Sequence, residues 1–262
     1  MINKPMVVVA AVVVVAGSGI AYYFHTRNAV PDTEPAAVQP APSEPTEPQI
    51  EHPVPRSMSP PAGPLPALGD SDPAMKDALA GVLGNDGMQY LVPESIVRHL
   101  VVTVDNLARQ KVPVSKRPSA AVSGSFLTQG DELHATIDPA NFARYDSMVG
   151  VVRKLDMQQV ADVYLRFYPL FQSAYRDLGY PNGYFNDRLV QVIDSLLAAP
   201  QPAGPIELTR PNVMYTFADP TLEALPAGQK LLLRMGPNNA AAVKAKLKEL
   251  RAVVVATAPP KH

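Results

Sequence analysis

The chain has 262 residues, of which 47% are hydrophobic, and a net charge of −1, so its overall charge does not indicate a nucleic-acid-binding protein. It contains no cysteine, which excludes disulfide bonds, thiolate metal sites and cysteine nucleophiles. The charge is uneven: residues 28–72 carry seven acidic side chains and one arginine, whereas residues 218–262 carry seven basic and three acidic side chains.

An apolar run near the N-terminus predicts a transmembrane anchor. Met6 to Phe24 contains 19 residues and no charge, and a bilayer core needs about 20 predominantly apolar residues. Lys4 precedes the run and an acidic segment follows it, which favours a cytoplasmic N-terminus. Gly19 and Ala21 also fit the cleavage site of a signal peptide, so cleavage is the alternative; the length of the run favours an anchor.

The composition divides the chain into an anchor (1–27), a Pro-rich acidic linker (28–66), a domain (67–257) and a disordered tail (258–262). Pro31 to Pro66 holds 12 prolines in 36 residues. Proline fixes φ and removes a backbone donor, so this linker is expected to be disordered and extended. At about 3.1 Å per residue it acts as a spacer of up to roughly 110 Å. Docking to proline-reading domains is the less favoured role.

Periodic apolar residues predict that the domain is mainly α-helical. The expected helices are Pro73 to Leu83, Pro93 to Gln110, one after Asp138-Pro139, one capped by Asp156, one from Phe185, one between Asp219 and Gly236, and one from Asn238 to Val254. The helix capped by Asp156 has the longest pattern, and Pro169 inside it predicts a kink or a division in two.

A small antiparallel β element is expected beside these helices. Phe126 to Thr128 and Leu133 to Ile137 flank a Gln-Gly-Asp-Glu turn and predict a hairpin. Ile206 to Leu208 and Val213 to Phe217 predict two further short strands, which are candidates for pairing with that hairpin.

Aromatic residues are concentrated in one stretch, since eight of the 17 Phe and Tyr residues fall between Tyr164 and Phe185. The candidate binding group is Arg144, Asp146, Tyr168, Tyr175, Arg176 and Tyr180. Aromatic faces with arginine forks suit sugars, peptides or carboxylates. The alternative, which we favour, is that the tyrosines pack between helices and the charged groups satisfy buried hydroxyls and helix caps.

The last helix carries a basic face made of Lys244, Lys246, Lys248 and Arg251. Such a face suits anionic lipid or polymer, but a solvated surface is the simpler interpretation.

Motifs for catalysis and cofactors are missing from the sequence. His99 and His134 have no partner at metal-ligand spacing, and no nucleophile elbow or phosphate-binding glycine loop occurs, so no metal or cofactor is expected. A carboxylate-pair hydrolase using Asp146, Asp156 or Asp177 is the enzymatic alternative.

Four segments resemble an uncharacterised bacterial family, the domain of unknown function numbered three thousand and fourteen. These segments are Asp-Pro-x-Asn-Phe-x-Arg-Tyr-Asp (138–146), Tyr-Pro-Leu-Phe-x-x-Ala-Tyr-x-x-Leu-Gly-Tyr-Pro (168–181), Phe-Ala-Asp-Pro-x-Leu-Glu (217–223) and Arg-Met-Gly-Pro (234–237). The resemblance implies a Gram-negative inner-membrane protein with its domain in the periplasm. It implies no activity.

The sequence therefore predicts a single-pass protein of the bacterial inner membrane, with one transmembrane helix, a disordered linker and a mainly α periplasmic domain. A binding or scaffolding role with an envelope protein or polymer is expected. An envelope hydrolase using carboxylates and tyrosines, or a structural subunit of an envelope complex, is the alternative.

Overall fold

The computed structural model describes residues 50–54, 63–110, 125–131, 134–211 and 214–255. Within these ranges the chain is mainly helical with small antiparallel ladders, which confirms the predicted fold class of the domain. None of the described helices is long and apolar enough to cross a membrane. The predicted anchor, Met6 to Phe24, and the tail 258–262 lie outside the described residues, as does most of the predicted linker.

The element bounds are as follows. The helices are η1 (Leu68–Asp70), α2 (Asp72–Met88), α3 (Ile96–Leu107), α4 (Ala140–Arg153), α5 (Met157–Asp177), α6 (Phe185–Leu197), α7 (Pro220–Glu223), α8 (Ala227–Arg234) and α9 (Pro237–Val254). The strands are β1 (Thr128–Gln129), β2 (Thr136–Ile137), β3 (Leu208–Thr209) and β4 (Thr216–Phe217).

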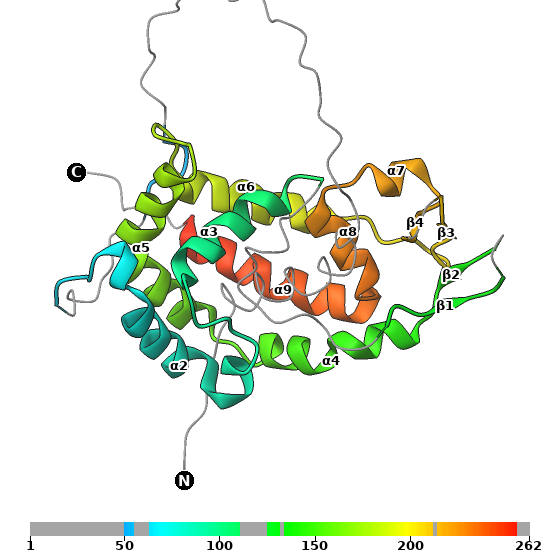
Figure 1. The fold of residues 1–262 in the computed structure, drawn as a ribbon, viewed down its shortest axis with the longest axis horizontal. Coiled ribbons are helices and arrows are strands. Elements are labelled where there is room, and N and C mark those ends of the chain that lie inside the picture. Colours follow the sequence, from blue (N-terminus) through cyan, green and yellow to red (C-terminus); the bar gives the residue numbers. More distant parts are fainter. Residues whose placement is uncertain (1–49, 55–62, 111–124, 132–133, 212–213, 256–262) are drawn as a thin grey trace, which may run out of the picture.

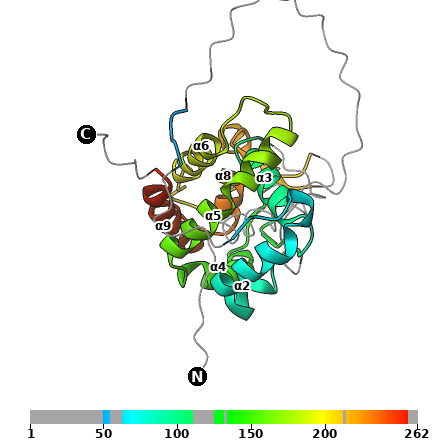
Figure 2. The same ribbon diagram turned by 90° about the vertical axis from the view of Figure 1, so that its left-hand side faces the viewer.

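The long helices surround the C-terminal helix, and the strands lie at one end of the body. In Figure 1, α9 runs across the middle of the view, with α3 and α6 above it, α4 below it and α5 at the end opposite the strands. Its packing partners are α4, α5, α6 and α8. The view in Figure 2, turned by a quarter, again places α6 and α2 on opposite sides of the body. The last helix therefore organises the core.

The first two helices differ from the predicted bounds. Gly84 interrupts the first helix as predicted, because it adopts the non-helical angles φ 55° and ψ −179°, which glycine tolerates. A second helical segment, which the sequence did not predict, follows to Met88, and α2 comprises both segments. The next helix begins at Ile96 rather than Pro93, since Ser95 is left-handed with φ 50°. The Asp72 carboxylate accepts hydrogen bonds from the Ser95 and Ile96 amides at 2.6 and 2.8 Å, so it caps α3 from another helix.

The cap of α5 is confirmed and its division is not. The Asp156 side chain accepts hydrogen bonds from the Gln158 and Gln159 amides at 2.8 and 3.4 Å, as the sequence predicts. The predicted division at Pro169 is wrong, because α5 is a single helix from Met157 to Asp177. Pro169 is exposed, and on the solvent side of a helix water can satisfy a carbonyl that has lost its partner.

The β element joins both predicted pairs of strands. β1 pairs antiparallel with β2, Thr128 opposite Ile137, and β3 pairs antiparallel with β4, Leu208 opposite Phe217. A bridge between Thr136 and Glu207 links the two ladders, and the Leu208 amide donates to the Ala135 carbonyl at 2.7 Å. The expected association of the late strands with the hairpin is thus confirmed.

The apolar residues form two separate cores. The large helical core contains the biggest fully buried side chains, among them Tyr164, Phe167 and Phe185. The small core lies under the strands and consists of Ala135, Ile137, Leu208, Phe217 and Leu233.

Candidate functional site

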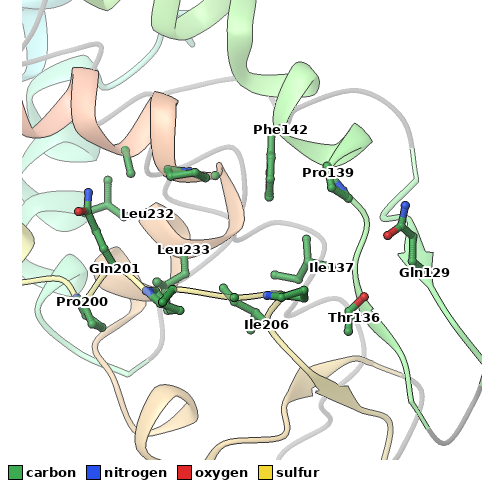
Figure 3. A pocket seen from close by; sticks show the side chains of 17 residues that line it. Gln129, Thr136, Ile137, Pro139, Phe142, Pro200, Gln201, Ile206, Leu232 and Leu233 are labelled. Carbon is green, nitrogen blue, oxygen red and sulfur yellow. The ribbon is translucent and has the colours of Figure 1, made fainter.

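An apolar cavity of about 320 Å³ lies between the small core and the start of α9. Its walls come from β1, β2, the first turn of α4, residues 200–206 and the junction of α8 with α9. Figure 3 shows Phe142 projecting from α4 across the cavity toward Ile137 and Ile206. No charged side chain is among the described residues that line it; the polar ones are Gln129, Thr136 and Gln201. The cavity suits an apolar group with a few hydrogen bonds at its edge.

A glycine shapes the wall between α8 and α9. Gly236 adopts φ +82°, and a Cβ atom there would lie 2.4 Å from Cγ of Phe142. The ring therefore rests directly on the backbone, and any side chain at Gly236 would displace it. Pro237 then begins α9 at a position that needs no amide donor.

The wall formed by residues 200–205 is poor in backbone hydrogen-bond donors. Three of the six residues from 200 to 205 are proline, and proline has no backbone N–H. This composition keeps the segment out of helix and sheet and leaves mainly carbon atoms at the cavity surface. Pro200, Pro202 and Pro205 all line the cavity.

The charged side chains behind the cavity are engaged in the fold. Lys230, only 5% exposed, donates from Nζ to Oε1 of Glu223 at 2.9 Å. The same carboxylate accepts a hydrogen bond from the Phe217 amide at 3.1 Å through its other oxygen. The Arg234 guanidinium lies 4.6 Å from the centre of the Phe217 ring. These contacts hold α7, α8 and β4 together, and the charges stay outside the cavity lining.

Two predicted site residues, Arg144 and Asp146, lie on α4 close to this region. Arg144 donates to Oδ1 of Asn141 at 3.2 Å, and Asn141 itself exchanges hydrogen bonds with the Leu127 main chain at 3.0 and 2.6 Å. Asp146 accepts a hydrogen bond from Asn239 of α9 at 2.9 Å. Both side chains therefore help to position the hairpin and α9 around the cavity.

Comparison with known families identifies the domain. The family model described as "Protein of unknown function (DUF3014)" matches residues 96–251. The chain belongs to the DUF3014 family. Neither the curated proteins nor the solved structures contain a match to it.

Segments that carry the DUF3014 resemblance meet at the cavity. Pro139 and Phe142 come from the first segment, Phe217 from the third and Gly236 from the fourth. The second segment, 168–181, lies instead in α5 and the turn after it. Three of the four DUF3014 segments thus build the cavity or the small core behind it.

The predicted tyrosines and Arg176 form a different group on α5 and the following turn. Tyr168 donates to Gln172 at 2.9 Å, and Tyr175 stacks on Tyr180 with ring centres 4.5 Å apart. Arg176 is exposed. These contacts do not include Arg144 or Asp146, so the predicted set is split between two places. Tyr175 is 6% exposed, so this ring packs between helices as the alternative interpretation predicts.

The sequence reading missed a buried carboxylate beside this group. Asp105 of α3 is 3% exposed and pairs with Arg188 of α6 at 3.0 Å and with Arg109 at 2.9 Å. Tyr180 donates to the same carboxylate at 3.2 Å. An acidic residue next to the apolar stripe of α3 was the available signal. The pairing joins α3 to α6.

The buried tyrosines of the DUF3014 domain have raised pKa values. Burial raises the pKa of Tyr164 well above its usual value of 10.0, with smaller contributions from Tyr168, Tyr184 and Asp187. Burial also raises the pKa of Tyr168, Tyr175 and Tyr145. These hydroxyls stay protonated at neutral pH, and those of Tyr164 and Tyr168 donate to Asn186 and Gln172.

The three carboxylates considered for hydrolysis have contacts within the fold. Asp156 caps α5, and Asp177 pairs with Arg98 at 2.9 Å. Asp146 binds Asn239. Within the described residues no group of three or more His, Cys, Asp or Glu side chains is placed to hold a metal ion.

The predicted basic face is mostly occupied by contacts within the fold. Lys244 donates to the carbonyl of Ala199, and Lys246 donates to the carbonyl of Leu155 at 2.9 Å. Arg251 pairs with Asp194. Lys248 is exposed. Burial and the nearby Lys248 lower the pKa of Lys244. Three of the four groups thus fasten α9 to its neighbours.

Proposed function

We propose that this DUF3014 protein is a binding protein of the bacterial cell envelope, whose cavity receives an apolar side chain of a partner protein. The observation that supports this proposal is the combination of a cavity of about 320 Å³ with a lining that contains no charged side chain among the described residues. Desolvated pockets of this kind receive the anchor residues that dominate protein interfaces.

The composition of the lining favours a protein partner over a lipid or a sugar. A fatty acid or phospholipid carries an anionic group that would be matched by a cation at the entrance, and no cation is among the described residues of the lining. A sugar needs many hydrogen-bond partners beside an aromatic face. Gln129, Thr136 and Gln201 are instead suited to one stretch of peptide main chain beside an apolar anchor.

The hydrolase alternative has less support. It requires Arg144, Asp146 and Arg176 to converge within hydrogen-bond reach around a concave site. Arg144 and Asp146 contact Asn141 and Asn239, whereas Arg176 lies at the exposed end of α5. None of the cavity's described lining residues carries a carboxylate, imidazole or amine that could act as a general acid or base.

The cellular placement is part of the same proposal. An anchor at Met6 to Phe24, with the N-terminus in the cytoplasm, would attach the chain to the inner membrane and hold the domain in the periplasm. The Pro-rich composition of the linker supports a spacer between membrane and domain. A scaffold or a subunit of an envelope complex fits this arrangement.

The test is a titration of the full-length chain in detergent with an uncharged, polarity-sensitive dye. Ala203→Trp is the blocking variant, because Ala203 is an exposed residue of the cavity wall where a large ring fills space without disturbing a core. Ala80→Trp, at an exposed position of α2, is the matched control. We expect saturable binding that Ala203→Trp weakens at least ~10-fold, the scale of a lost apolar contact, while the control stays unchanged.

Competition then identifies the ligand class. A peptide with one large apolar residue should displace the dye, whereas a fatty acid and an oligosaccharide should not. Stronger displacement by the fatty acid would replace the protein partner with a lipid. Dye binding that Ala203→Trp does not alter would refute the cavity as the binding site.

A further inference from the structure

A short stretch of the predicted linker is bound to the first turn of α6. The amides of Glu51 and His52 donate to the Asp187 carboxylate at 3.2 and 2.6 Å. The Val54 amide donates to the Tyr184 hydroxyl at 3.0 Å, and Asn186 donates to the His52 carbonyl at 2.8 Å. These four contacts use the main chain of the stretch and not its side chains.

Between Glu51 and Val54, proline occupies the one position that donates no amide to the site. Glu51, His52 and Val54 each present an amide to an acceptor, and Pro53, which has no amide, lies between the last two. Proline also holds the chain extended, so less conformational entropy is lost when it binds. Pro53 itself is exposed, so its contribution is this extended backbone, set before binding.

The binding groups also have partners within the domain itself. Asn186 is fully buried; its oxygen accepts from the Tyr164 hydroxyl at 3.0 Å, and its nitrogen also donates to the Val254 carbonyl at 3.2 Å. The Tyr184 ring packs against Tyr168 with ring centres 5.7 Å apart. A fully buried amide aimed at a peptide carbonyl and fixed by two helices makes a built site.

We propose that Tyr184, Asn186 and Asp187 form a binding site for an extended, proline-containing peptide, and that Ile50–Val54 of the same chain is its resident occupant. The resident segment covers the site, and a second extended peptide with proline at the position of Pro53 competes with it. This site is separate from the cavity and does not depend on the function proposed for it.

Chain connectivity sets the concentration at which a competitor acts. Eight residues, 55–62, separate the bound stretch from the next described residue, Gly63. A short linker gives its bound end an effective concentration in the millimolar range. A free peptide with the same contacts therefore has to reach ~1–10 mM to displace the resident segment.

Hydrogen exchange on the full-length chain in detergent tests the proposal. The Glu51, His52 and Val54 amides should exchange roughly 10- to 100-fold more slowly than unprotected amides, the factor expected for hydrogen bonds to a strong acceptor. Asp187→Ala should remove the protection of Glu51 and His52. Asp156→Ala, which removes a carboxylate from the start of α5 instead, is the matched control and should leave that protection in place.

Variants of the resident segment and free peptides complete the test without risk to the domain. His52→Pro removes the donor of the 2.6 Å contact and should release the segment, whereas Ile50→Pro changes an exposed residue whose amide is not among these contacts. A free peptide of residues 48–57 at ~10 mM should release it too, and the same peptide with His52→Pro should not.

Results of three kinds would overturn the proposal. The first is exchange of these amides at unprotected rates in the unaltered chain. The second is equal protection with and without the Asp187 carboxylate, or release by neither peptide. The third is protection that falls on dilution, which would assign the bound segment to a second copy of the chain.

Discussion

The tyrosine-rich corner of α5 and α6 and the proline- and glycine-lined cavity use apolar residues in opposite ways. At the corner, rings fill the space between helices: Phe171 and Phe185 stack 5.8 Å apart with an interplanar angle of 4°, and Tyr164 packs on both. At the cavity, the small core contains five buried residues and leaves about 320 Å³ beside it. The rings at the corner fill the space between the helices, whereas the prolines and glycines of the cavity wall leave a space that a ligand could enter.

The largest effect should come from removing a ring at the corner. Phe185 is 1% exposed and contacts three other aromatic side chains. We expect Phe185→Ala to lower the free energy of unfolding by about 3–5 kcal/mol. Phe126→Ala, at a half-buried ring of the small core, should cost only about 1 kcal/mol. Urea unfolding of both variants measures the difference, and equal costs would remove the contrast between the two regions.

The buried ion pair at the corner should rank next. Asp105→Ala leaves the Arg188 guanidinium, whose side chain is 17% exposed, without its carboxylate partner. We expect a loss of about 3 kcal/mol in the free energy of unfolding, the low end of the range for a broken buried pair, because Arg188 keeps its bonds to the Asp105 carbonyl and to Gln191. Asp177→Ala is the control: it breaks a pair with Arg98 in which both side chains are about half exposed, so about 0–1 kcal/mol is expected. Chemical denaturation at low salt measures both.

A single methyl group at the cavity wall should have a smaller but clear effect. Gly236→Ala places Cβ against Phe142 and forces an alanine to φ +82°, which we expect to cost about 2–4 kcal/mol. Gly204→Ala, on the same cavity but in open space, should change the free energy of unfolding by less than about 0.5 kcal/mol. Dye binding by Gly236→Ala should weaken as well. Unchanged stability would show that the ring moves freely.

Alkaline pH should destabilise the corner gradually. The folded-state pKa of Tyr164 is raised by burial, so the unfolded chain loses this proton first. The contribution of such a tyrosine to the free energy of unfolding is fully present below about pH 10. It is lost as the pH rises toward the folded-state pKa, by about 1.4 kcal/mol per pH unit for each such tyrosine. The doubly substituted Tyr164→Phe, Tyr168→Phe protein should show a flatter decline. Urea unfolding at several pH values measures the slope.

Local sequence rules predicted the helices, the hairpin and the Asp156 cap. These features depend on spacing and on groups a few residues apart, such as Asp156 and the two amides that follow it. The break at Gly84 was predicted in the same way, but the helical segment that follows it to Met88 was not, because a glycine can either end a helix or bend it.

The site residues were only partly predictable because they depend on tertiary placement. The prolines of 200–205 and Gly236 are far apart in the sequence, and only the fold brings them to one cavity. Arg144 and Asp146 were selected for their charge; in the fold Arg144 contacts Asn141 of its own helix α4, and Asp146 contacts Asn239 of α9. The binding of Ile50–Val54 uses main-chain groups that every sequence possesses, so composition gave no sign of it.

The contacts of Ile50–Val54 also determine how the domain responds to force. Tension applied from the N-terminal side of Ile50 reaches the fold first at the start of α6, through the Asp187, Tyr184 and Asn186 contacts, and only afterwards at η1 and α2. Asn186 in turn bonds the Val254 carbonyl at the end of α9. A force on this segment is therefore transmitted to α6 and α9, and it reaches α2 only after the contacts of the segment have broken.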